Sequence, residues 1–266
     1  MQIAGSRVLL TGATGGLGRA IAKALHERGA HMLLSGRRQE ALEELCRELG
    51  GTRAEALAAD LAKREDVEAL PGWAGQVDIL VHNAGLPGSG RLEAFTPEEL
   101  DRVIDVNLRA GVQLTRALMP GMVERGRGHL VFVSSMAGKI PTVRAAIYSA
   151  TKYGLRGFAG AMRDDLHGTG VGVSVVFPGP ISEGGMWAET GIQTPKGVPK
   201  RYPHQVAAAV VKGIERDKAE IDVADPIQKL GALTAALTPT TGARIRRAIG
   251  LSKIADETAD AQKNKR

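Results

Sequence analysis

The sequence predicts an α/β fold: one doubly wound domain with a central parallel sheet of about seven strands and helices on both faces. Three observations predict it. Short apolar or β-branched runs alternate with helical patterns from residue 7 to residue 224. A glycine-rich stretch at 11–18 joins the first run to the first helical pattern. The chain has 266 residues, 43% of them hydrophobic, and α/β chains of about that length commonly form one domain.

The first half of the chain supplies strands and helices in alternation. In the first helix, Leu17, Ile21 and Leu25 form one apolar stripe, and Gly29 ends the helix. The fourth strand is almost wholly apolar, as expected of a strand that is buried on both faces. Strands are expected at 7–12, 31–36, 53–60 and 77–85, and helices at 16–29, 39–50 and 64–73.

The second half continues the alternation with longer helices. A helix is expected over 96–126, where Thr96 can cap the N-terminus, Pro97 suits the first helical position and Glu99 completes a capping box. Residues 180–202 and those after Pro226 break the pattern, so we expect a domain over 1–225 and a helical, basic extension over 226–266. The other expected elements are strands at 128–135, 171–179 and 219–224, and helices at 145–170 and 203–218.

Composition argues against several classes of protein. The chain has one cysteine, so it can form no internal disulfide; Cys46 lies at helical spacing from three leucines and is expected to be a buried thiol. No apolar run approaches the roughly 20 residues of a membrane span, and the N-terminus lacks a signal-peptide pattern, so a cytoplasmic location is expected. Aromatic residues make up 3%, which supplies few stacking platforms for bases. No nucleic-acid partner and no metal site are expected.

The segment TGATGGLG at 11–18 is a candidate nucleotide site. Gly12, Gly16 and Gly18 would let the backbone turn sharply and lie against a pyrophosphate at a helix N-terminus. The alternative is a purely structural glycine turn. Because the segment falls between the first strand and the first helix, it favours nucleotide binding by a Rossmann-type domain.

The tip of the second strand bears on the choice of cofactor. NAD-binding strands in this position usually end in an acid that holds the ribose 2′-hydroxyl, whereas this strand runs into Arg37 and Arg38. Guanidinium groups can hold a 2′-phosphate with forked hydrogen bonds. We therefore expect NADP(H) to be preferred over NAD(H). The alternative is that the two arginines merely begin a solvated helix.

Seven motifs in the right order make the chain resemble the short-chain dehydrogenase/reductase (SDR) family over residues 5–224. The glycine turn is similar to the T-G-x-x-x-G-x-G turn of that family, and AAD, ending at Asp60, to the acid that touches adenine. HNAG (82–85) resembles its N-N-A-G strand end, VNL its helix asparagine, VSSMAG its serine, YSATK its Y-x-x-x-K, and PG the residues after its sixth strand. The resemblance implies cofactor binding by Gly12, Thr14, Gly16, Leu17, Gly18, Arg37, Arg38, Asp60, Leu61, Asn83, Ala84, Gly85, Tyr148, Lys152, Pro178, Gly179 and Ile181.

Two positions depart from the family pattern. His82 replaces the first asparagine of N-N-A-G and is expected to be a polar spacer on a buried strand end. The family often has a threonine four residues after the Pro-Gly glycine, to contact the nicotinamide amide. Glu183 stands there, with Ser182 before it, which leaves the backbone of Ile181 as the candidate for that contact.

The stretch AAIYSATKYG holds the candidate acid/base. Tyr148 and Lys152 are four residues apart and share one face of a helix. An ammonium near the phenol should lower its pKa and let it exchange a proton with an alcohol or alkoxide. Ser135 would orient the carbonyl, whereas Ser134 should face away because strand side chains alternate. Tyr153, about 100° further round the helix, is expected to pack or to face solvent.

The resemblance implies two further roles at this site. Lys152 would also hydrogen-bond the nicotinamide ribose, and Asn107 would bind a water that passes protons to Lys152. Together the residues predict an NADP(H)-dependent oxidoreductase with Tyr148 as general acid/base. Its rivals are a non-catalytic NADP-binding redox sensor or scaffold, and an epimerase or dehydratase acting on nucleotide sugars. The latter usually has a larger C-terminal substrate domain.

Residues 183–201 are expected to form a substrate lid. Glycines followed by Met186 and Trp187 suggest a mobile loop with an apolar face, and so a small ketone or secondary alcohol on a lipid-, steroid- or polyketide-like skeleton. The alternative is a loop whose Trp187 packs on the body. The resemblance also suggests a homodimer or homotetramer, formed through the helices at 96–126 and 147–169.

The tail carries most of the net charge of +6, with seven basic and three acidic residues from Arg244 to Arg266. Apolar residues recur in it at helical spacing. Its helices could cap the substrate site, cover a neighbouring subunit, or lie on an anionic membrane as a peripheral contact. The final residues, 256–266, are expected to be disordered. The apolar positions are Ile227, Leu230, Leu233, Leu237, Ile245, Ile249 and Ile254.

Overall fold

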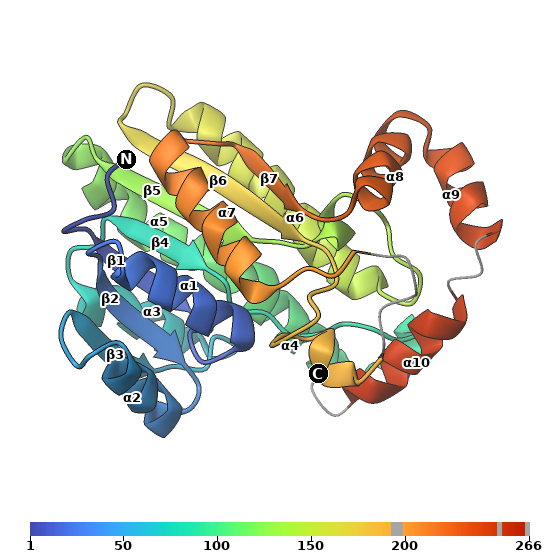
Figure 1. The fold of residues 1–266 in the computed structure, drawn as a ribbon, viewed down its shortest axis with the longest axis horizontal. Coiled ribbons are helices and arrows are strands. Elements are labelled where there is room, and N and C mark those ends of the chain that lie inside the picture. The colour runs from blue at the N-terminus through green and yellow to red at the C-terminus, as the bar shows by residue number, and fades with distance from the viewer. Residues whose placement is uncertain (193–198, 249–251, 264–266) are drawn as a thin grey trace.

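Seven parallel strands form one sheet in the order β3-β2-β1-β4-β5-β6-β7 (Figure 1). The computed structural model describes residues 1–192, 199–248 and 252–263. The predicted α/β class and its doubly wound parallel sheet are confirmed. The strands are β1 Arg7–Thr11, β2 His31–Gly36, β3 Ala54–Ala58, β4 Ile79–His82, β5 Gly128–Val133, β6 Val171–Pro178 and β7 Glu220–Val223.

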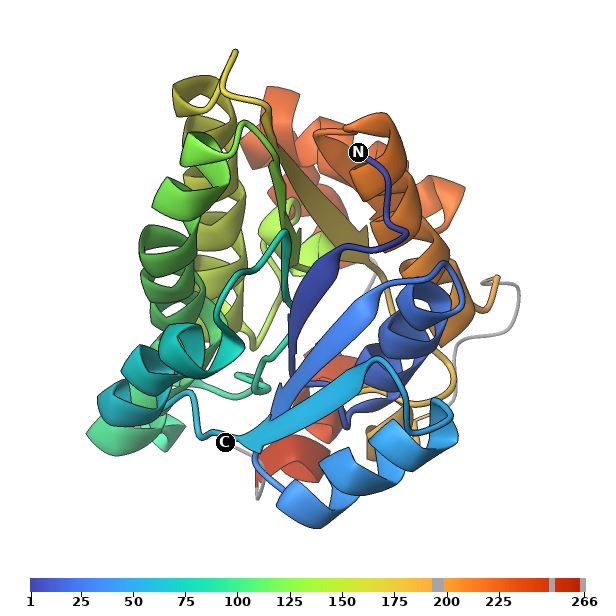
Figure 2. The same cartoon turned by 90° about the vertical axis from the view of Figure 1, so that its left-hand side faces the viewer.

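Helices cover both faces of the sheet. Figure 2 shows the green helices of the middle of the chain on one face, and the blue and orange helices α1 and α7 on the other. The helices of the main body are α1 Gly16–His26, α2 Gln39–Glu48, α3 Arg64–Ala74, α4 Pro97–Ile104, α5 Ala110–Glu124, α6 Ala146–Asp165 and α7 Pro203–Arg216. Those of the C-terminal extension are α8 Pro226–Leu237, α9 Pro239–Ala248 and α10 Ser252–Gln262.

The strand order reverses between β1 and β4. From β1 the chain builds outward through β2 to β3, then returns to place β4 on the other side of β1. Helices after β1 and after β4 therefore leave on opposite faces, and a crevice opens at the carboxyl ends of these two strands. This is the place where doubly wound sheets bind ligands.

Alternate residues of each central strand feed two separate cores. In β1, Leu9 faces the core that α3, α5 and α6 cover, whereas Val8 and Leu10 face the core beneath α1 and α7. All four residues of β4 are buried, so the expectation of a strand buried on both faces is confirmed. Cys46 differs slightly from its expectation, because it is half-buried at the edge of the second core.

The helix expected over 96–126 is interrupted by a π-turn. The capping box is present: Thr96 Oγ1 accepts from the Glu99 amide at 3.2 Å, and Glu99 Oε2 accepts from the Thr96 amide at 2.9 Å. Helix α4 then passes through a π-turn, Asp105–Arg109, before α5 begins. Periodicity alone does not reveal such a turn, since one wider turn changes the apolar pattern very little. π-Turns within helices often mark functional sites.

The C-terminal extension forms three helices that turn back over the body (Figure 1). The expectation of disorder over 256–266 is wrong for residues 256–262, which lie in α10. Contacts with the body explain the order: Arg144 Nε binds Asp256 Oδ1 at 2.6 Å, and Gln262 Nε2 donates to the Met186 carbonyl at 3.1 Å. Residues 264–266, Ile249 and the side chains of Ile245 and Ile254 lie outside the described part.

Candidate active site

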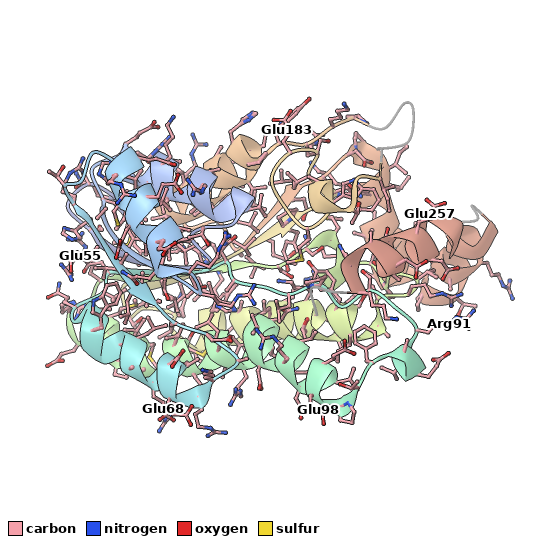
Figure 3. All side chains as sticks on the ribbon, turned by 90° about the horizontal axis from the view of Figure 1, so that it is seen from below. Glu55, Glu68, Arg91, Glu98, Glu183 and Glu257 are labelled. Carbon is pink, nitrogen blue, oxygen red and sulfur yellow. The ribbon has the colours of Figure 1, made fainter. Side chains whose placement is uncertain are left out.

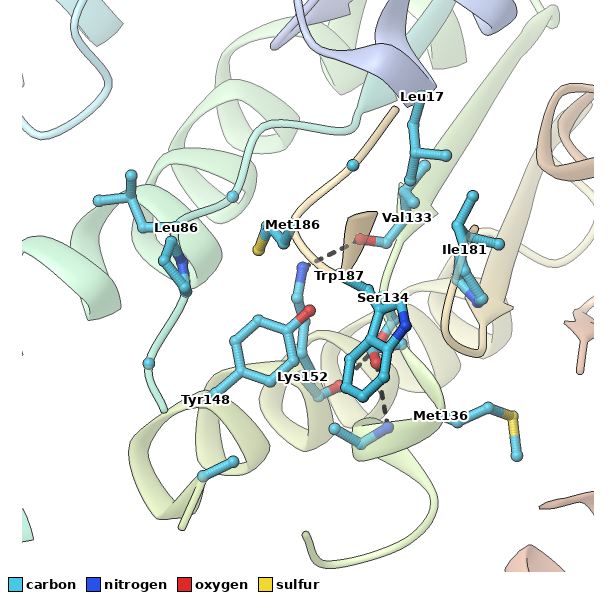
Figure 4. Close-up of a pocket in the computed structure, with 18 of the residues that line it drawn as sticks. Leu17, Leu86, Val133, Ser134, Met136, Tyr148, Lys152, Ile181, Met186 and Trp187 are labelled. Carbon is cyan, nitrogen blue, oxygen red and sulfur yellow. Dashed lines mark hydrogen bonds between the residues drawn. The ribbon is translucent and has the colours of Figure 1, made fainter. Parts of the chain in front are cut away.

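A cavity of about 1320 Å³ opens at the carboxyl ends of the central strands and extends toward the C-terminal helices (Figure 4). Every residue that the sequence offered for cofactor binding lines this cavity, and so does Ser135. Asn107 does not line it. The cavity therefore joins the glycine turn, the arginine tip of β2 and the Tyr-Lys pair in one continuous space.

The glycine turn is closely packed, which explains its residue types. Gly12 has a φ of +65°, and a Cβ there would lie 2.8 Å from the Ala84 Cα. A side chain on Gly18 would collide with the Gly12 carbonyl, and one on Gly16 would collide with the backbone of Gly184. The three glycines thus allow the backbone of the turn to pack closely against neighbouring backbone at the start of α1, where a pyrophosphate could meet the helix N-terminus.

The HNAG strand end supports this turn. Asn83 Nδ2 donates to the carbonyls of Thr11 and Gly12, both at 3.1 Å. The Thr11 hydroxyl oxygen in turn accepts from the amides of Asn83 and Ala84, at 3.2 and 3.1 Å. The end of β4 and the glycine turn after β1 are therefore tied by hydrogen bonds rather than by apolar packing alone.

The candidate adenosine end carries positive charge. Arg37 and Arg38 are both exposed and both line the cavity, at the carboxyl end of β2. Asp60, after β3, has its carboxylate engaged: Oδ1 accepts from the Ala62 amide at 3.1 Å, and Oδ2 faces Arg102 at 3.3 Å. A cation pair with no carboxylate at the tip of β2 suits a phosphorylated ribose better than a free diol.

Tyr148 and Lys152 project from α6 into the same cavity (Figure 4). The Lys152 Nζ lies 5.6 Å from the centre of the Tyr148 ring and donates to the Val133 carbonyl at 3.1 Å. Burial lowers the pKa of Lys152 to about 8. Burial raises the pKa of Tyr148, and a hydrogen bond with Ser135 opposes that rise.

The direction of the tyrosine shift differs from the sequence expectation. We expected the ammonium to lower the pKa of Tyr148. Desolvation of the phenolate outweighs the hydrogen bond with Ser135, which provides the opposing effect. Lys152 directs its ammonium to a backbone carbonyl instead of to the phenol oxygen. Tyr148 is therefore a neutral phenol here, ready to donate a proton.

The two serines after β5 have different partners, but Ser134, which was expected to face away, also lines the cavity. Ser135 reaches Tyr148, and its Oγ also accepts from the Ala137 amide at 3.1 Å. Ser134 turns to α6, where its Oγ donates to the Lys152 carbonyl at 3.0 Å. Its hydrogen bond to the Lys152 carbonyl means that Ser134 anchors the helix that carries the lysine.

Asn107 is fully buried in the π-turn behind the cavity. Its Oδ1 accepts from the Leu86 amide at 2.6 Å, and its Nδ2 donates to the Leu86 carbonyl at 3.0 Å and to the Thr151 hydroxyl at 3.3 Å. The side chain is thus committed to protein groups. Any water at this position would have to meet the backbone of the turn, not the Asn107 amide.

The two departures from the family pattern fall in different settings. His82 is fully buried, and Thr11 Oγ1 lies 3.3 Å from its Nδ1. Glu183 is exposed and points away from the body (Figure 3), so it cannot replace the missing threonine. The Ser182 hydroxyl oxygen is buried and has no hydrogen-bond partner among the described residues. Ile181 lines the cavity.

Several lining residues were not anticipated from the sequence. Gln228 and Gly231 of α8, with Thr258 and Gln262 of α10, close the far side of the cavity. Helical spacing predicted the helices but could not predict where they would lie. Met186 and Trp187 line the cavity, as a lid would; residues 193–198 of the expected lid lie outside the described part.

No cluster of His, Cys, Asp and Glu within the described ranges could hold a metal ion. In the same ranges, no helix is long and apolar enough to cross a membrane. The cavity itself fits a phosphorylated dinucleotide: the glycine turn lines it at the N-terminal end of α1, and two exposed guanidinium groups line it at the tip of β2.

An open parallel sheet with this glycine turn, this cation pair and a Tyr-Lys-Ser group in one cavity defines a dinucleotide-dependent oxidoreductase. The short chain dehydrogenase family model matches residues 6–194. The chain belongs to that family, and it is an NAD(P)-dependent short-chain dehydrogenase/reductase.

Known proteins agree with this assignment. The chain is 35% identical to the ketoacyl reductase HetN of Nostoc sp., over 97% of this chain and 94% of that protein. It is 41% identical to the NADP-dependent 3-hydroxy acid dehydrogenase YdfG of Shigella flexneri, over 65% of this chain and 72% of that protein. A structure of a variant actinorhodin polyketide ketoreductase with NADPH superimposes with a TM-score of 0.74 and 30% identity, over 84% of this chain and 97% of that one.

Proposed function

We propose that the protein transfers hydride between NADP(H) and a ketone or secondary alcohol on an apolar skeleton, with Tyr148 as general acid/base. One observation carries the proposal above the others. One continuous cavity is lined by Tyr148, Lys152 and Ser135 and also by Arg37 and Arg38. A bound cofactor would then place its reactive ring beside the phenol.

The residues of this chain have distinct roles in the proposal. The nicotinamide, when bound, supplies or accepts the hydride. Ser135 and Tyr148 hold the carbonyl oxygen of the substrate, and Tyr148 gives its proton to the oxygen as negative charge develops there. Lys152 stabilises the phenolate that remains, because its ammonium lies near the ring. Asn107 supports this group from behind through Leu86 and Thr151.

Selection of NADP(H) over NAD(H) rests on Arg37 and Arg38. Both are exposed at the tip of β2, where a 2′-phosphate would lie, and neither forms an ion pair with another described residue. The remaining cofactor contacts in the proposal are those offered by the sequence, with Asp60 at the adenine and Ile181 at the nicotinamide. NADP is named for YdfG and NADPH for the actinorhodin ketoreductase, which favours the same choice here.

The substrate class follows from the far end of the cavity. Apolar side chains from the segment after β5, from the lid and from α8 line it: Met136, Ile140, Val143, Met186, Trp187, Ile227 and Leu230. Such a wall favours a hydrophobic substrate with few charges. A 3-oxoacyl or polyketide-like ketone would suit this apolar wall. The names of HetN, a ketoacyl reductase, and of the actinorhodin polyketide ketoreductase favour the same substrate class.

The domain boundaries, the oligomeric state and the location of the protein are also parts of the proposal. Residues 1–225 would form the catalytic domain, with a lid at 183–201, and residues 226–266 an extension that caps the substrate end. A homodimer or homotetramer would pair the outer helices α4, α5 and α6, and the protein would act in the cytoplasm without nucleic acid. Peripheral membrane contact through the tail is the minor alternative.

A panel of apolar ketones and alcohols tests the function. Purified protein is mixed with NADPH or NADP⁺ and the absorbance at 340 nm is followed, with NADH and NAD⁺ as controls. Turnover of a 3-oxoacyl thioester or a bulky ketone with NADPH is the expected result. Tight NADPH binding without turnover of any carbonyl would instead favour the redox-sensor alternative.

A further inference from the structure

The sheet buries two histidines, His82 at the carboxyl end of β4 and His129 near the amino end of β5. The Nε2 of His129 is paired with the Ser174 hydroxyl at 2.9 Å. The Nε2 of His82 is buried and has no partner of good hydrogen-bond geometry among the described residues; its weaker polar contacts are with the backbone of Asn107 and Val106. A buried polar group with such weak partners is costly, so its presence beside the active site calls for a reason.

The hydrogen bonds of Thr11 determine which nitrogen of His82 carries the proton. The Thr11 oxygen already accepts two backbone amides, from Asn83 and Ala84. Its one proton is therefore free to go to the Nδ1 of His82, 3.3 Å away. Nδ1 is thus an acceptor, and a neutral imidazole must carry its hydrogen on Nε2.

The imidazole is kept neutral by its surroundings. Burial, together with the nearby Lys152 ammonium, lowers the pKa of His82 to about 3. His82 cannot act as an acid or base at physiological pH. Its contribution must come from the fixed position of a neutral donor, Nε2–H.

That donor lies against the π-turn Asp105–Arg109. A Cβ on Gly111, one residue into α5, would lie 2.8 Å from the His82 Cδ2 and 3.1 Å from its Nε2. The backbone carbonyls of Asn107 and Val106 also act on the ring. A π-turn leaves a carbonyl without its usual helical N–H, because its hydrogen bonds span five residues instead of four.

We propose that His82 is a positioning residue: held by Thr11, its imidazole braces the π-turn and so fixes Asn107 behind Lys152. The connection runs through contacts already described. Asn107 fixes Leu86 and Thr151, and a Cβ on Gly85 would lie 3.4 Å from the Asn107 Oδ1 and 3.5 Å from the Lys152 Nζ. Movement of the turn would therefore reach the lysine ammonium. The proposal rests on the proposed roles of Lys152 and Tyr148.

Two variants of similar size separate the polar role from packing. His82→Asn keeps one acceptor for Thr11 and one donor for the turn, whereas His82→Leu keeps neither. With an acetoacetyl thioester and NADPH, we expect His82→Leu to lower kcat about tenfold or more while the KM for NADPH stays within about twofold, because small misplacement of catalytic groups costs rate. His82→Asn should restore most of kcat.

The second histidine gives the matched control. His129→Leu also removes a buried, hydrogen-bonded imidazole, whose pKa burial lowers to about 4, but at the end of the sheet away from the site. It should lower the melting temperature and leave kcat unchanged. A second pair tests the contact from the other side: Gly111→Ala should lower kcat, whereas Gly121→Ala, further along α5, meets only the flexible Arg125 side chain and should not.

Hydrogen exchange gives a readout that does not depend on turnover. Amides of residues 105–110 should exchange faster in His82→Leu than in His129→Leu or in the wild type. Unchanged exchange there, wild-type kcat in His82→Leu, or a loss in His82→Asn as large as in His82→Leu would each overturn the proposal. Wild-type protein that reduces no carbonyl would overturn the proposed function instead, and the exchange experiment would still decide the role of His82.

Discussion

Lys152 makes two hydrogen bonds with the end of strand β5. Its Nζ donates to the Val133 carbonyl at 3.1 Å, and its own carbonyl accepts from the Ser134 hydroxyl at 3.0 Å. These two bonds fix helix α6 against the end of β5. Because Ser135 follows Ser134 directly, they also hold Tyr148 of the same helix next to Ser135. The contact between strand and helix thus aligns Ser135, Tyr148 and Lys152.

Replacement of Tyr148 by phenylalanine should abolish turnover and spare cofactor binding. The phenol is the one group in the proposal that gives a proton to the developing alkoxide, and a missing general acid typically costs 10²–10⁴-fold. NADPH binding is measured by fluorescence and turnover at 340 nm. Tyr153→Phe, one residue beyond Lys152 and outside the cavity lining, is the control and should retain kcat. Near-normal kcat in Tyr148→Phe would disprove its role.

Replacement of Lys152 by methionine should separate stability from activity. The pKa of Lys152 falls to about 8 in the fold, whereas an unfolded lysine has a value of about 10.4. Between these two pKa values the unfolded chain binds more protons than the folded chain, so the free energy of unfolding of the wild type rises with pH through this window. Below about pH 8 the lysine is protonated in both states, and the full cost of burying its ammonium lowers the stability of the wild type. Lys152→Met should lose kcat yet unfold in urea at an equal or higher concentration at pH 7.

The urea midpoints of the two proteins give a direct check across pH. Without cofactor, the advantage of Lys152→Met should shrink as the pH rises from 8 to 10, because the wild-type lysine loses its proton. A difference that stays constant over this range would show that the buried ammonium carries no such cost.

Removal of Arg37 and Arg38 should change cofactor choice. A hydrogen bond to a charged group contributes about 1.5–3 kcal/mol. Loss of the equivalent of one such bond in Arg37→Ala/Arg38→Ala should raise the KM for NADPH about 10- to 100-fold and leave the KM for NADH almost unchanged. Arg47→Ala removes an exposed charge from helix α2, which follows the two arginines, outside the cavity lining and serves as control. Equal losses with both cofactors would contradict selection at the 2′-phosphate.

Two exposed leucines of α8 provide a test of the substrate wall. Leu230 is 61% exposed and lines the cavity, whereas Leu237 is 72% exposed and does not. If apolar substrate covers α8, Leu230→Ser should raise the KM for an apolar ketone about 5- to 20-fold, in line with partial loss of a buried leucine contact, with the KM for NADPH unchanged. Leu237→Ser should change neither. Equal effects of the two substitutions on the KM would argue against α8 as part of the substrate wall.

The sequence was sufficient for the sheet and for the cofactor end of the cavity. Apolar runs of period two and helical stripes are local patterns, so the seven strands and the main-body helices could be predicted within a few residues. The glycine turn could also be predicted from the sequence. Close packing at Gly12 and Gly18 permits no side chain, so the turn requires glycines at these positions. The disorder expected of 256–262 failed since the order of α10 depends on contacts with Arg144 and Met186.

Sequence by itself determined which groups this protein brings to its chemistry: a tyrosine four residues before a lysine, a serine thirteen residues before that tyrosine, and two arginines at a strand tip. Local spacing specifies these, because a helix or strand repeats over a few residues. Only the tertiary structure decided that desolvation raises the pKa of Tyr148, that Asn107 is committed to Leu86 and Thr151, and that His82 lies against a π-turn. Burial and cross-element contacts depend on segments far apart in the chain, and no local pattern encodes their distances.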